Sequence, residues 1–335
     1  MADVVLMKGP MVTVARAPLA LNEAVKRFAL SNEAGGKSPR TIAWYTAMLG
    51  QFIAYLKTIP YPAYLPAISM EKVRDYIIFL HHRPRYEGHP YSPVKAGPPS
   101  PKTVQCHVRA LKAFASWLHA EGYTTSNHLQ HLQLPKAPAT IVVPLTTDEI
   151  NKIIASLNKK SPGGARNHAL LVTLLDTGLR ASEAAGITLG HLNLVDGHIK
   201  VMGKGAKERM VPIGKYASST LANYIEKVRP SPADPGGDRL FLSPGGKPIT
   251  PNSINQAFAR IAGASGVTKL HAHRCRHTFA INYLMNGGDI FSLKGIMGHA
   301  TLDMVNHYLH FTLSQITAQH HKFSPMDKLE EAKQL

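Results

Sequence analysis

The stretch HAHRCRH at residues 271–277 places three histidines, two arginines and one cysteine within seven positions. Side chains of these types hold metal ions, bind phosphate groups, or form an ordinary basic face on a helix. Each of these readings needs different partners. The residues that the rest of the chain supplies therefore decide what this stretch does and which fold contains it.

A metal site is the first of these possibilities. A structural zinc site needs four ligands that converge on the ion. The stretch offers ligands at every second position, from His271 through His273 and Cys275 to His277. On a helix, which we expect here, such residues spread around the cylinder, and only His273 and His277 share a face. The sequence therefore predicts neither a metal site nor a cofactor.

The composition points to a polyanionic partner. The chain has 335 residues, of which 44% are hydrophobic, and this is enough for two packed domains. Its formal net charge is +17 and its sequence pI is about 9.8. An enzyme of small metabolites has little use for such an excess, whereas nucleic acid attracts it. The alternative is a basic surface without a binding role.

The cellular location is predicted from three features: the cysteine content, the length of the apolar runs and the N-terminal residues. The two cysteines, Cys106 and Cys275, lie far apart and indicate no disulfide framework, so we expect a reducing compartment. No apolar run reaches the about 18 residues that a membrane helix needs. Residues 1–18 lack the basic start and apolar core of a signal peptide. These features predict a cytoplasmic protein without a membrane partner.

Residues 1–137 read as a helical domain. Helical spacing of apolar residues occurs over 21–34, 38–58, 68–80 and 100–123. The second and fourth of these segments begin with Ser-Pro, a strong helix start, and Ser69 is the expected cap of the third. The insert at 83–100 is too rich in proline and glycine for a regular element. It is compatible with a DNA-contacting loop, a subunit contact or a disordered excursion.

A proline-rich segment separates this domain from the next. It predicts an inter-domain linker at 138–144. The second domain, 145–335, opens with a threonine-capped helix and is mostly helical, with a break at Gly178. Residues 197–214 alternate around a glycine-rich turn and predict two strands of a small antiparallel sheet.

Three further stretches contain residues capable of chemistry: TGLRASE (177–183), GKGAKER (203–209) and MGHATLDMVNHYLH (297–310). Each has an ordinary reading when it is taken alone. An arginine after a glycine break faces solvent in most proteins, and GKGAKER is compatible with a plain basic turn. A histidine after a glycine and a tyrosine on an amphipathic helix are weak signals singly.

Taken in order, the four stretches are much more specific. They give arginine, lysine, His-x-x-Arg, Gly-His, and a tyrosine nine residues after that histidine. This pattern resembles the tyrosine recombinase (phage integrase) family over residues 145–310. The resemblance implies a mainly α fold with a small antiparallel β-sheet, in which a helical core DNA-binding (SAM-like) domain precedes the catalytic domain. About 20 residues precede the first helix, too few for a separate arm-binding domain, so the two-domain Xer-like type fits better.

The resemblance implies roles for particular residues. Six are expected to be catalytic: Arg180 and Arg276 as the two arginines, Lys204 as the hairpin lysine, His273 and His299 as the two histidines, and Tyr308 as the nucleophile. Glu183 and His277 are expected to support them. On the hairpin, Lys207 and Arg209 are expected to face the DNA backbone or solvent.

The chemistry of these residue types agrees with the resemblance. Attack on a phosphodiester builds charge on its non-bridging oxygens, and guanidinium groups bind such oxygens with paired hydrogen bonds. Neighbouring cations favour the ionised form of a tyrosine and so make it a better nucleophile. A lysine can protonate the leaving 5′-oxygen as general acid. Neither a metal nor ATP is then required.

Contacts with DNA outside the catalytic site are expected at the two Ser-Pro helix starts, because helix N-termini favour phosphate. The candidates are Arg40, Thr41, Lys102, Thr103 and Arg109. Ordinary caps and solvent-facing charges are the alternative for each of them. The sequence assigns no residue to base readout.

The predicted function is that of a site-specific DNA recombinase. It would act through a 3′-phosphotyrosyl intermediate and a Holliday junction. Residues 311–335 are expected to contact a neighbouring subunit in a homotetramer on paired double-stranded DNA sites, with a frayed tail as the alternative. Two other functions stay open: a type IB topoisomerase-like enzyme that relaxes DNA, and a non-catalytic DNA-binding regulator.

Overall fold

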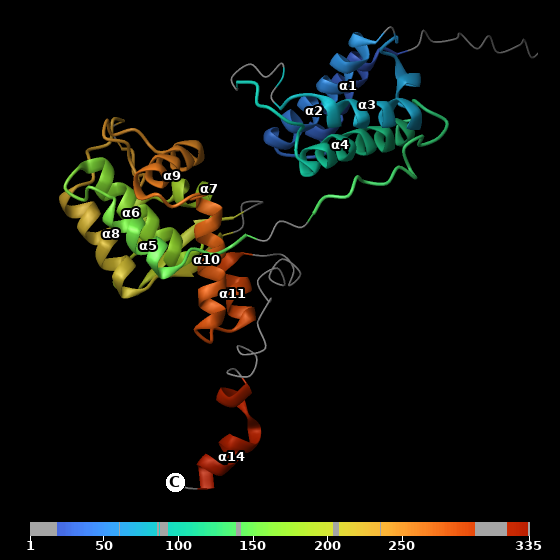
Figure 1. The fold of residues 1–335 in the computed structure, drawn as a ribbon. Helices are drawn as coiled ribbons and strands as arrows, with labels where there is room; N and C mark the ends of the chain where they lie inside the picture. The colour runs from blue at the N-terminus through green and yellow to red at the C-terminus, as the bar shows by residue number, and fades with distance from the viewer. Residues whose placement is uncertain are drawn as a thin grey trace, which may run out of the picture. The chain divides into compact units, whose positions relative to one another are not determined.

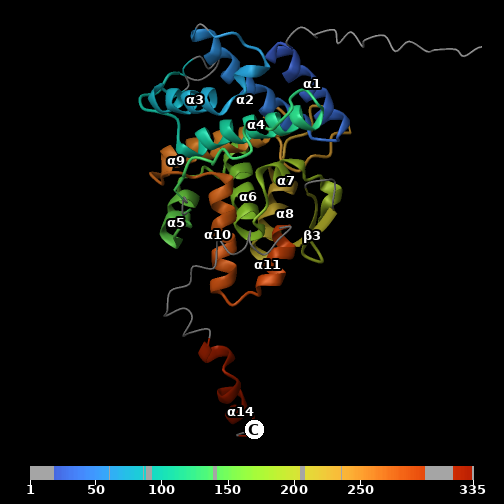
Figure 2. The ribbon, with the colours of Figure 1, turned by 90° about the vertical axis from the view of Figure 1, so that its right-hand side faces the viewer.

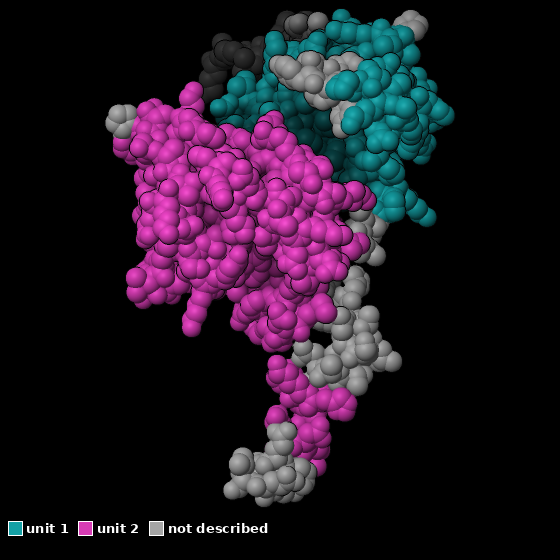
Figure 3. Space-filling model, turned by 60° about the vertical axis from the view of Figure 1, so that its left-hand side comes forward, with its two compact units in different colours: residues 1–140 teal, residues 141–335 magenta. Residues whose placement is uncertain are grey.

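The computed structural model describes residues 19–59, 61–85, 87, 93–138, 142–203, 208–234, 236–298 and 320–333. The chain folds as two compact units, residues 1–140 and residues 141–335, which Figure 3 distinguishes by colour. Each unit has its own hydrophobic core.

The described residues of unit 1 form four α-helices and one 3-10 turn (Figures 1 and 2). The elements are α1 (Leu21–Ala34), α2 (Pro39–Thr58), η1 (Leu65–Ala67), α3 (Met70–His82) and α4 (Pro101–Ala120). Ser38 and Ser100 cap α2 and α4, and a proline follows each of them. Ser69 caps α3 in the same way, by accepting a hydrogen bond from a backbone amide of the first turn. All three predicted helix starts are therefore confirmed.

The core of unit 1 contains an aromatic cluster. Phe28 of α1 packs against Phe114 and Trp117 of α4, with ring centroids 5.4 and 5.3 Å away. A second group centres on Tyr76 of α3, whose hydroxyl shares a hydrogen bond with the ring of His107 on α4. Aromatic contacts thus join the long helix α4 to α1 at one point and to α3 at another.

Unit 2 contains the other described helices and the only sheet among the described residues. Its helices are α5 (Thr147–Ala155), α6 (Pro162–Thr177), α7 (Ala181–Gly186), α8 (Lys215–Lys227), α9 (Pro251–Ser265), α10 (Ala272–Met285), α11 (Ile290–Met297) and α14 (Pro325–Lys333), with a 3-10 turn η2 (Leu189–His191). Helix α6 lies beside both α8 and α10 (Figures 1 and 2). Leu171 and Leu174, in the last two turns of α6, are fully buried.

The sheet has three antiparallel strands in the order β1 (Leu192–Asn193), β2 (His198–Met202) and β3 (Glu208–Pro212). In the β2–β3 ladder Ile199 pairs with Val211 and Val201 with Arg209. The sequence predicts the two longer strands but not β1, which is only two residues long and carries no alternation of its own.

The mainly α fold with a small antiparallel sheet is confirmed. The predicted break at residue 178 is also present: α6 ends there, and Gly178 adopts a left-handed conformation with φ of 61°. A Cβ at this position would lie 2.4 Å from the Phe279 ring, so backbone conformation and packing both require glycine. None of the described helices is long and apolar enough to span a membrane.

His107 makes the stability of unit 1 depend on pH. Its ring is 2% exposed, and burial, followed by the charge of Arg83, lowers its pKa from 6.5 to about 4. Between these values the unfolded chain binds a proton that the folded unit does not. Stability that is fully present above pH 6.5 is therefore lost as the pH falls towards 4, by about 3 kcal/mol in total.

Tryptophan fluorescence can isolate this effect, because both tryptophans of the chain, Trp44 and Trp117, lie in unit 1. We expect the urea midpoint of wild type to fall between about pH 7 and pH 4.5, and that of His107→Gln to fall much less. His119→Gln, which changes an exposed histidine of the same helix, should keep the wild-type dependence. Equal pH dependence in wild type and His107→Gln would contradict the assignment.

Candidate active site

The stretch HAHRCRH forms the N-terminal end of α10. His271 is the N-cap, and its ring Nδ1 accepts a hydrogen bond from the Arg274 amide at 3.1 Å. A histidine is an unusual cap, but its ring nitrogen replaces the carboxylate or hydroxyl oxygen that fills this role elsewhere. The cap fixes where the helix begins and so fixes which of the following side chains turn inward.

Arg276 turns inward, with only 2% of its surface exposed. Its guanidinium donates from Nη1 to the Gly178 carbonyl at 2.6 Å and from Nη2 to the Met297 carbonyl at 2.8 Å. These carbonyls lie at the C-terminal ends of α6 and α11, where the helix dipole favours a positive charge. Arg276 therefore joins the end of α6, two residues before Arg180, to the end of α11.

Arg180 lies immediately before α7 and faces Glu183, which is the third residue of that helix. Glu183 Oε2 accepts from the Arg180 amide at 2.9 Å, and Oε1 accepts from Arg180 Nη1 at 2.8 Å. The side chain of Glu183 is 4% exposed, whereas that of Arg180 is 36% exposed. The carboxylate is thus a buried anchor, and the guanidinium reaches the surface.

Arg209 of β3 completes the environment of this carboxylate. Its Nη1 and Nη2 donate to Oε1 and Oε2 of Glu183, each at 3.0 Å, and its Nε donates to the Ile296 carbonyl at 2.9 Å. The side chain is 14% exposed. The prediction that Arg209 faces the DNA backbone or solvent is wrong, because all three of its guanidinium nitrogens are hydrogen-bonded inside the unit.

Strand alternation contains a signal for this inward position. Arg209 lies two residues before Val211, which is fully buried, so both side chains belong to the inner face of the strand. The stretch GKGAKER by itself does not distinguish a basic residue at the hairpin turn from a basic residue on the inner face of the strand. The alternation of buried and exposed positions that separates the two is found only when Met210 and Val211 are included.

His273 and His277 form a pair on the exposed side of α10. Their Nε2 atoms lie 3.0 Å apart, so one ring donates a hydrogen bond to the other. Partial burial, and then the positive charges of Arg276, His271 and Arg180, lower the pKa of His273. His273 is therefore neutral near pH 7, a state in which one ring nitrogen accepts and the other donates.

Three of the predicted catalytic residues, Lys204, His299 and Tyr308, lie outside the described residues, as does Lys207. The structure describes residues on both sides of 204–207 and residues before His299, but none next to Tyr308. The two strands that precede and follow residues 204–207 pair with each other, and α11 ends at Met297 before Gly298. Among the described side chains, those of Arg180, Glu183 and Arg209 contact one another, and His273 contacts His277. Arg276 contacts the backbone just before Arg180 and at the end of α11.

The other residues of HAHRCRH have structural roles. Arg274 donates to the carbonyls of Val143 and Thr268, at 3.0 and 2.8 Å, and forms an ion pair with Glu149 at 2.9 Å. It therefore fixes the segment through which the chain enters unit 2. Burial raises the pKa of Cys275, which is fully buried, to about 12. Over the part of the chain that the structure describes, no three histidine, cysteine or acidic side chains gather as metal ligands do.

The DNA-binding candidates of unit 1 lie at the surface. Arg40, Lys102, Thr103 and Arg109 are exposed, and Thr41 is partly buried. The two Ser-Pro helix starts have the same geometry, since Ser38 lies 2.8 Å from the Thr41 hydroxyl and Ser100 lies 2.9 Å from that of Thr103.

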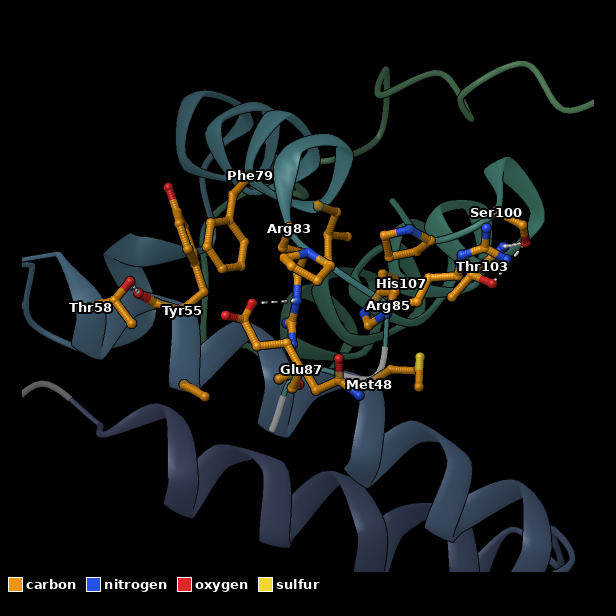
Figure 4. A pocket seen from close by; sticks show the side chains of 15 residues that line it. Met48, Tyr55, Thr58, Phe79, Arg83, Arg85, Glu87, Ser100, Thr103 and His107 are labelled. Carbon is orange, nitrogen blue, oxygen red and sulfur yellow. Dashed lines mark hydrogen bonds and ion pairs between the residues drawn. The ribbon is translucent and has the colours of Figure 1, made fainter. Parts of the chain in front are cut away.

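A cavity of about 800 Å³ lies beside the second of these helix starts, between α2, the end of α3, the insert and α4 (Figure 4). Apolar and aromatic side chains such as Tyr55 and Phe79 line most of it. The insert adds Arg85 and an ion pair between Arg83 and Glu87, 3.6 Å long. The part of the insert that the structure describes thus closes one side of a cavity instead of projecting freely.

Known proteins resemble the chain over most of its length. The family model described as "Phage integrase family" matches residues 144–314. Tyrosine recombinase XerD of Listeria innocua is 29% identical over 293 residues, which cover 87% of this chain and 94% of that protein. Tyrosine recombinase XerC of Yersinia pestis is 31% identical over 227 residues, which cover 68% of this chain and 74% of that protein.

Solved structures show the same fold. The Tn1549 transposon integrase in complex with transposon right end DNA has a TM-score of 0.68 at 19% identity, covering 91% of this chain and 100% of that chain. A lambda integrase tetramer bound to a Holliday junction has a TM-score of 0.64 at 19% identity, covering 84% and 78%. The matched residues 144–314 contain every predicted catalytic residue. The chain belongs to the phage integrase family of tyrosine recombinases.

Proposed function

We propose that this protein is a site-specific DNA recombinase that cuts and rejoins strands through a 3′-phosphotyrosyl intermediate. The observation that carries the proposal is the arrangement around Arg276. Its buried guanidinium binds the Gly178 carbonyl, two residues before Arg180, and the Met297 carbonyl, two residues before His299. Arg276 belongs to α10, the helix that also carries His273. Arg180, Arg209 and Arg276 come from three separate stretches of sequence, and the hydrogen bonds of Glu183 and of the carbonyls at the ends of α6 and α11 link them.

The proposed phosphate site contains Arg180, His273 and Arg276, with His299 as a fourth donor. A phosphodiester in this site would receive hydrogen bonds on its non-bridging oxygens, where charge builds up during attack. Arg180 is the more accessible of the two arginines. His273, neutral at pH 7, can donate one hydrogen bond without adding charge.

The reaction follows from the roles proposed for Tyr308 and Lys204. The Tyr308 oxygen attacks the scissile phosphorus, and the bond between phosphorus and the 5′-oxygen breaks. Lys204 gives a proton to that 5′-oxygen. The DNA is then held by a 3′-phosphotyrosyl ester, whose later attack by a 5′-hydroxyl of another strand restores a phosphodiester and releases the tyrosine. Exchange of one strand from each duplex would form a Holliday junction.

We also propose that unit 1 is a DNA-binding domain, with residues 138–144 as the linker to the catalytic domain. The net charge of +17 supports a polyanionic partner, and the exposed candidates at the two Ser-Pro helix starts support phosphate contacts there. A cytoplasmic location, with access to DNA, belongs to the same proposal.

Assembly into a homotetramer on paired DNA sites is the third element of the proposal. A lambda integrase of the same fold has been solved as a tetramer bound to a Holliday junction. In this chain the tail that follows Tyr308 contains α14, and residues 311–335 are proposed to contact a neighbouring subunit. A type IB topoisomerase-like activity is the second candidate, because the same phosphate site can relax DNA without strand exchange.

The nucleophile can be tested with a nicked suicide substrate, in which the cut strand loses its 5′-hydroxyl fragment and cannot be rejoined. The DNA site is first selected from a randomised duplex library retained by the protein. Wild type should form an adduct that survives denaturation, and Tyr308→Phe should form none, because phenylalanine has no oxygen to attack phosphorus. Tyr216→Phe, which removes an exposed hydroxyl elsewhere in the same unit, is the matched control and should behave as wild type. An adduct in Tyr308→Phe would exclude this tyrosine.

The tail can be tested by ending the chain at residue 310. We expect the shortened protein to bind a single DNA site as wild type does, but to lose cooperative assembly on paired sites and the Holliday junction product. Native gels of increasing protein concentration on one-site and two-site duplexes measure both properties. Unchanged assembly would exclude the tail as a subunit contact. DNA relaxation without junction formation by the full-length chain would favour the topoisomerase-like activity.

A further inference from the structure

Arg209 connects three segments of unit 2 that are far apart in the sequence. It is part of β3, it binds Glu183 near the start of α7, and it binds the Ile296 carbonyl near the end of α11. It also packs on the turn that follows α11. A Cβ at Gly298 would lie 3.1 Å from three guanidinium atoms of Arg209, and Gly298 has a φ of 62°. The left-handed turn and the arginine therefore fit each other closely.

The carboxylate that Arg209 binds is deeply buried. Burial alone would raise the pKa of Glu183, but the hydrogen bonds from Arg209 and from the Arg180 amide bring it below its ordinary value of 4.5. Glu183 is therefore charged near neutral pH. A buried charge needs compensation, and a carboxylate beside a phosphate site would also repel the DNA.

Two guanidinium groups share this one carboxylate unequally. Arg209 takes both oxygens as a two-pronged contact, whereas the side chain of Arg180 reaches only Oε1, through Nη1. Within the described residues, Nε and Nη2 of Arg180 donate no hydrogen bond, and the side chain is 36% exposed. One carboxylate and two guanidinium groups together carry one net positive charge. Of the two guanidinium groups, that of Arg180 is the more accessible to a ligand.

We propose that Arg209 is a positioning residue for strand cleavage: by neutralising Glu183 it leaves Arg180 with charge and hydrogen-bond donors for the DNA phosphate. The inference rests on the proposed function. Without Arg209, the buried carboxylate has only Arg180 as a cationic partner. Arg180 would then form the two-pronged pair itself, and its donors would be turned away from the DNA.

The inference predicts a rescue that a purely structural role does not. We expect Arg209→Gln to form the covalent adduct about 10- to 100-fold more slowly at saturating DNA, with less than about threefold change in the half-saturating DNA concentration. The double variant Glu183→Gln/Arg209→Gln no longer contains the unpaired carboxylate. It should recover at least about tenfold over Arg209→Gln, which gives a coupling between the two positions.

The measurement is the single-turnover rate on the nicked substrate defined above. Lys200→Gln is the matched control, because it removes one positive charge from the same hairpin at an exposed pair with Glu208. We expect it to stay within about twofold of wild type. Arg209→Lys keeps the charge without the paired geometry and should be intermediate, and it provides the comparison if Arg209→Gln does not fold, as judged by thermal melting.

The outcomes separate this inference from the proposed function. If wild type forms no adduct, the proposed function fails. If wild type cleaves but the double variant is as slow as Arg209→Gln, Arg209 supports the fold through its contacts at Ile296 and Gly298, and the inference is wrong. If Lys200→Gln is as slow as Arg209→Gln, the effect comes from the total charge of the hairpin, and the inference is also wrong.

Discussion

Unit 2 depends on a buried guanidinium whose hydrogen bonds join two helix ends. Arg276 lies on α10, and its donors reach the last carbonyls of α6 and α11. Burying a positive charge is costly unless strong acceptors surround it, and the carbonyls at helix C-termini are such acceptors. Both helices end in glycines with left-handed conformations, Gly178 and Gly298. The hydrogen bonds of Arg276 thus tie the two turns to α10, and the predicted catalytic residues Arg180 and His299 follow these turns in the sequence.

The arginines of the site have different tasks although they belong to one residue type. Arg276 and Arg209 are enclosed and hydrogen-bonded to the protein, whereas Arg180 is only partly buried. Phosphate binding needs cations that are already in place, since ordering them during the reaction would raise the barrier. In the proposed site, Arg276 contributes to this order because it holds the backbone that precedes Arg180. Arg209 contributes because it binds the carboxylate that Arg180 also contacts.

Local chemistry explains how much of the fold can be predicted from the sequence. Ser38, Ser69 and Ser100 identify helix starts because a cap acts within three residues of its own position. Gly178 identifies a helix end for the same reason. The strand β1 escapes prediction, since two residues show no periodicity. The spacing of His-x-x-Arg identifies His273 and Arg276 as site candidates through the resemblance, not through any local rule.

The contacts of Arg209 and Arg274 could not be predicted in this way. Arg209 meets a carboxylate 26 positions earlier, and Arg274 meets a carbonyl 131 positions earlier. Such pairs depend on the packing of whole elements, which no short window contains. Residue type and local sequence pattern do not distinguish an arginine that binds DNA from an arginine that binds its own protein. Only the inner-face alternation of β3 offered a partial signal.

The attachment of Arg274 to the entry segment has a mechanical consequence. Its guanidinium holds the carbonyl of Val143, while the Leu145 amide is held by the hydroxyl of Thr278, one turn further along α10. Two side chains of α10 therefore hold the backbone on either side of Pro144. Any displacement of residues 143–145 would act directly on the first two turns of α10, the turns that carry His273 and Arg276.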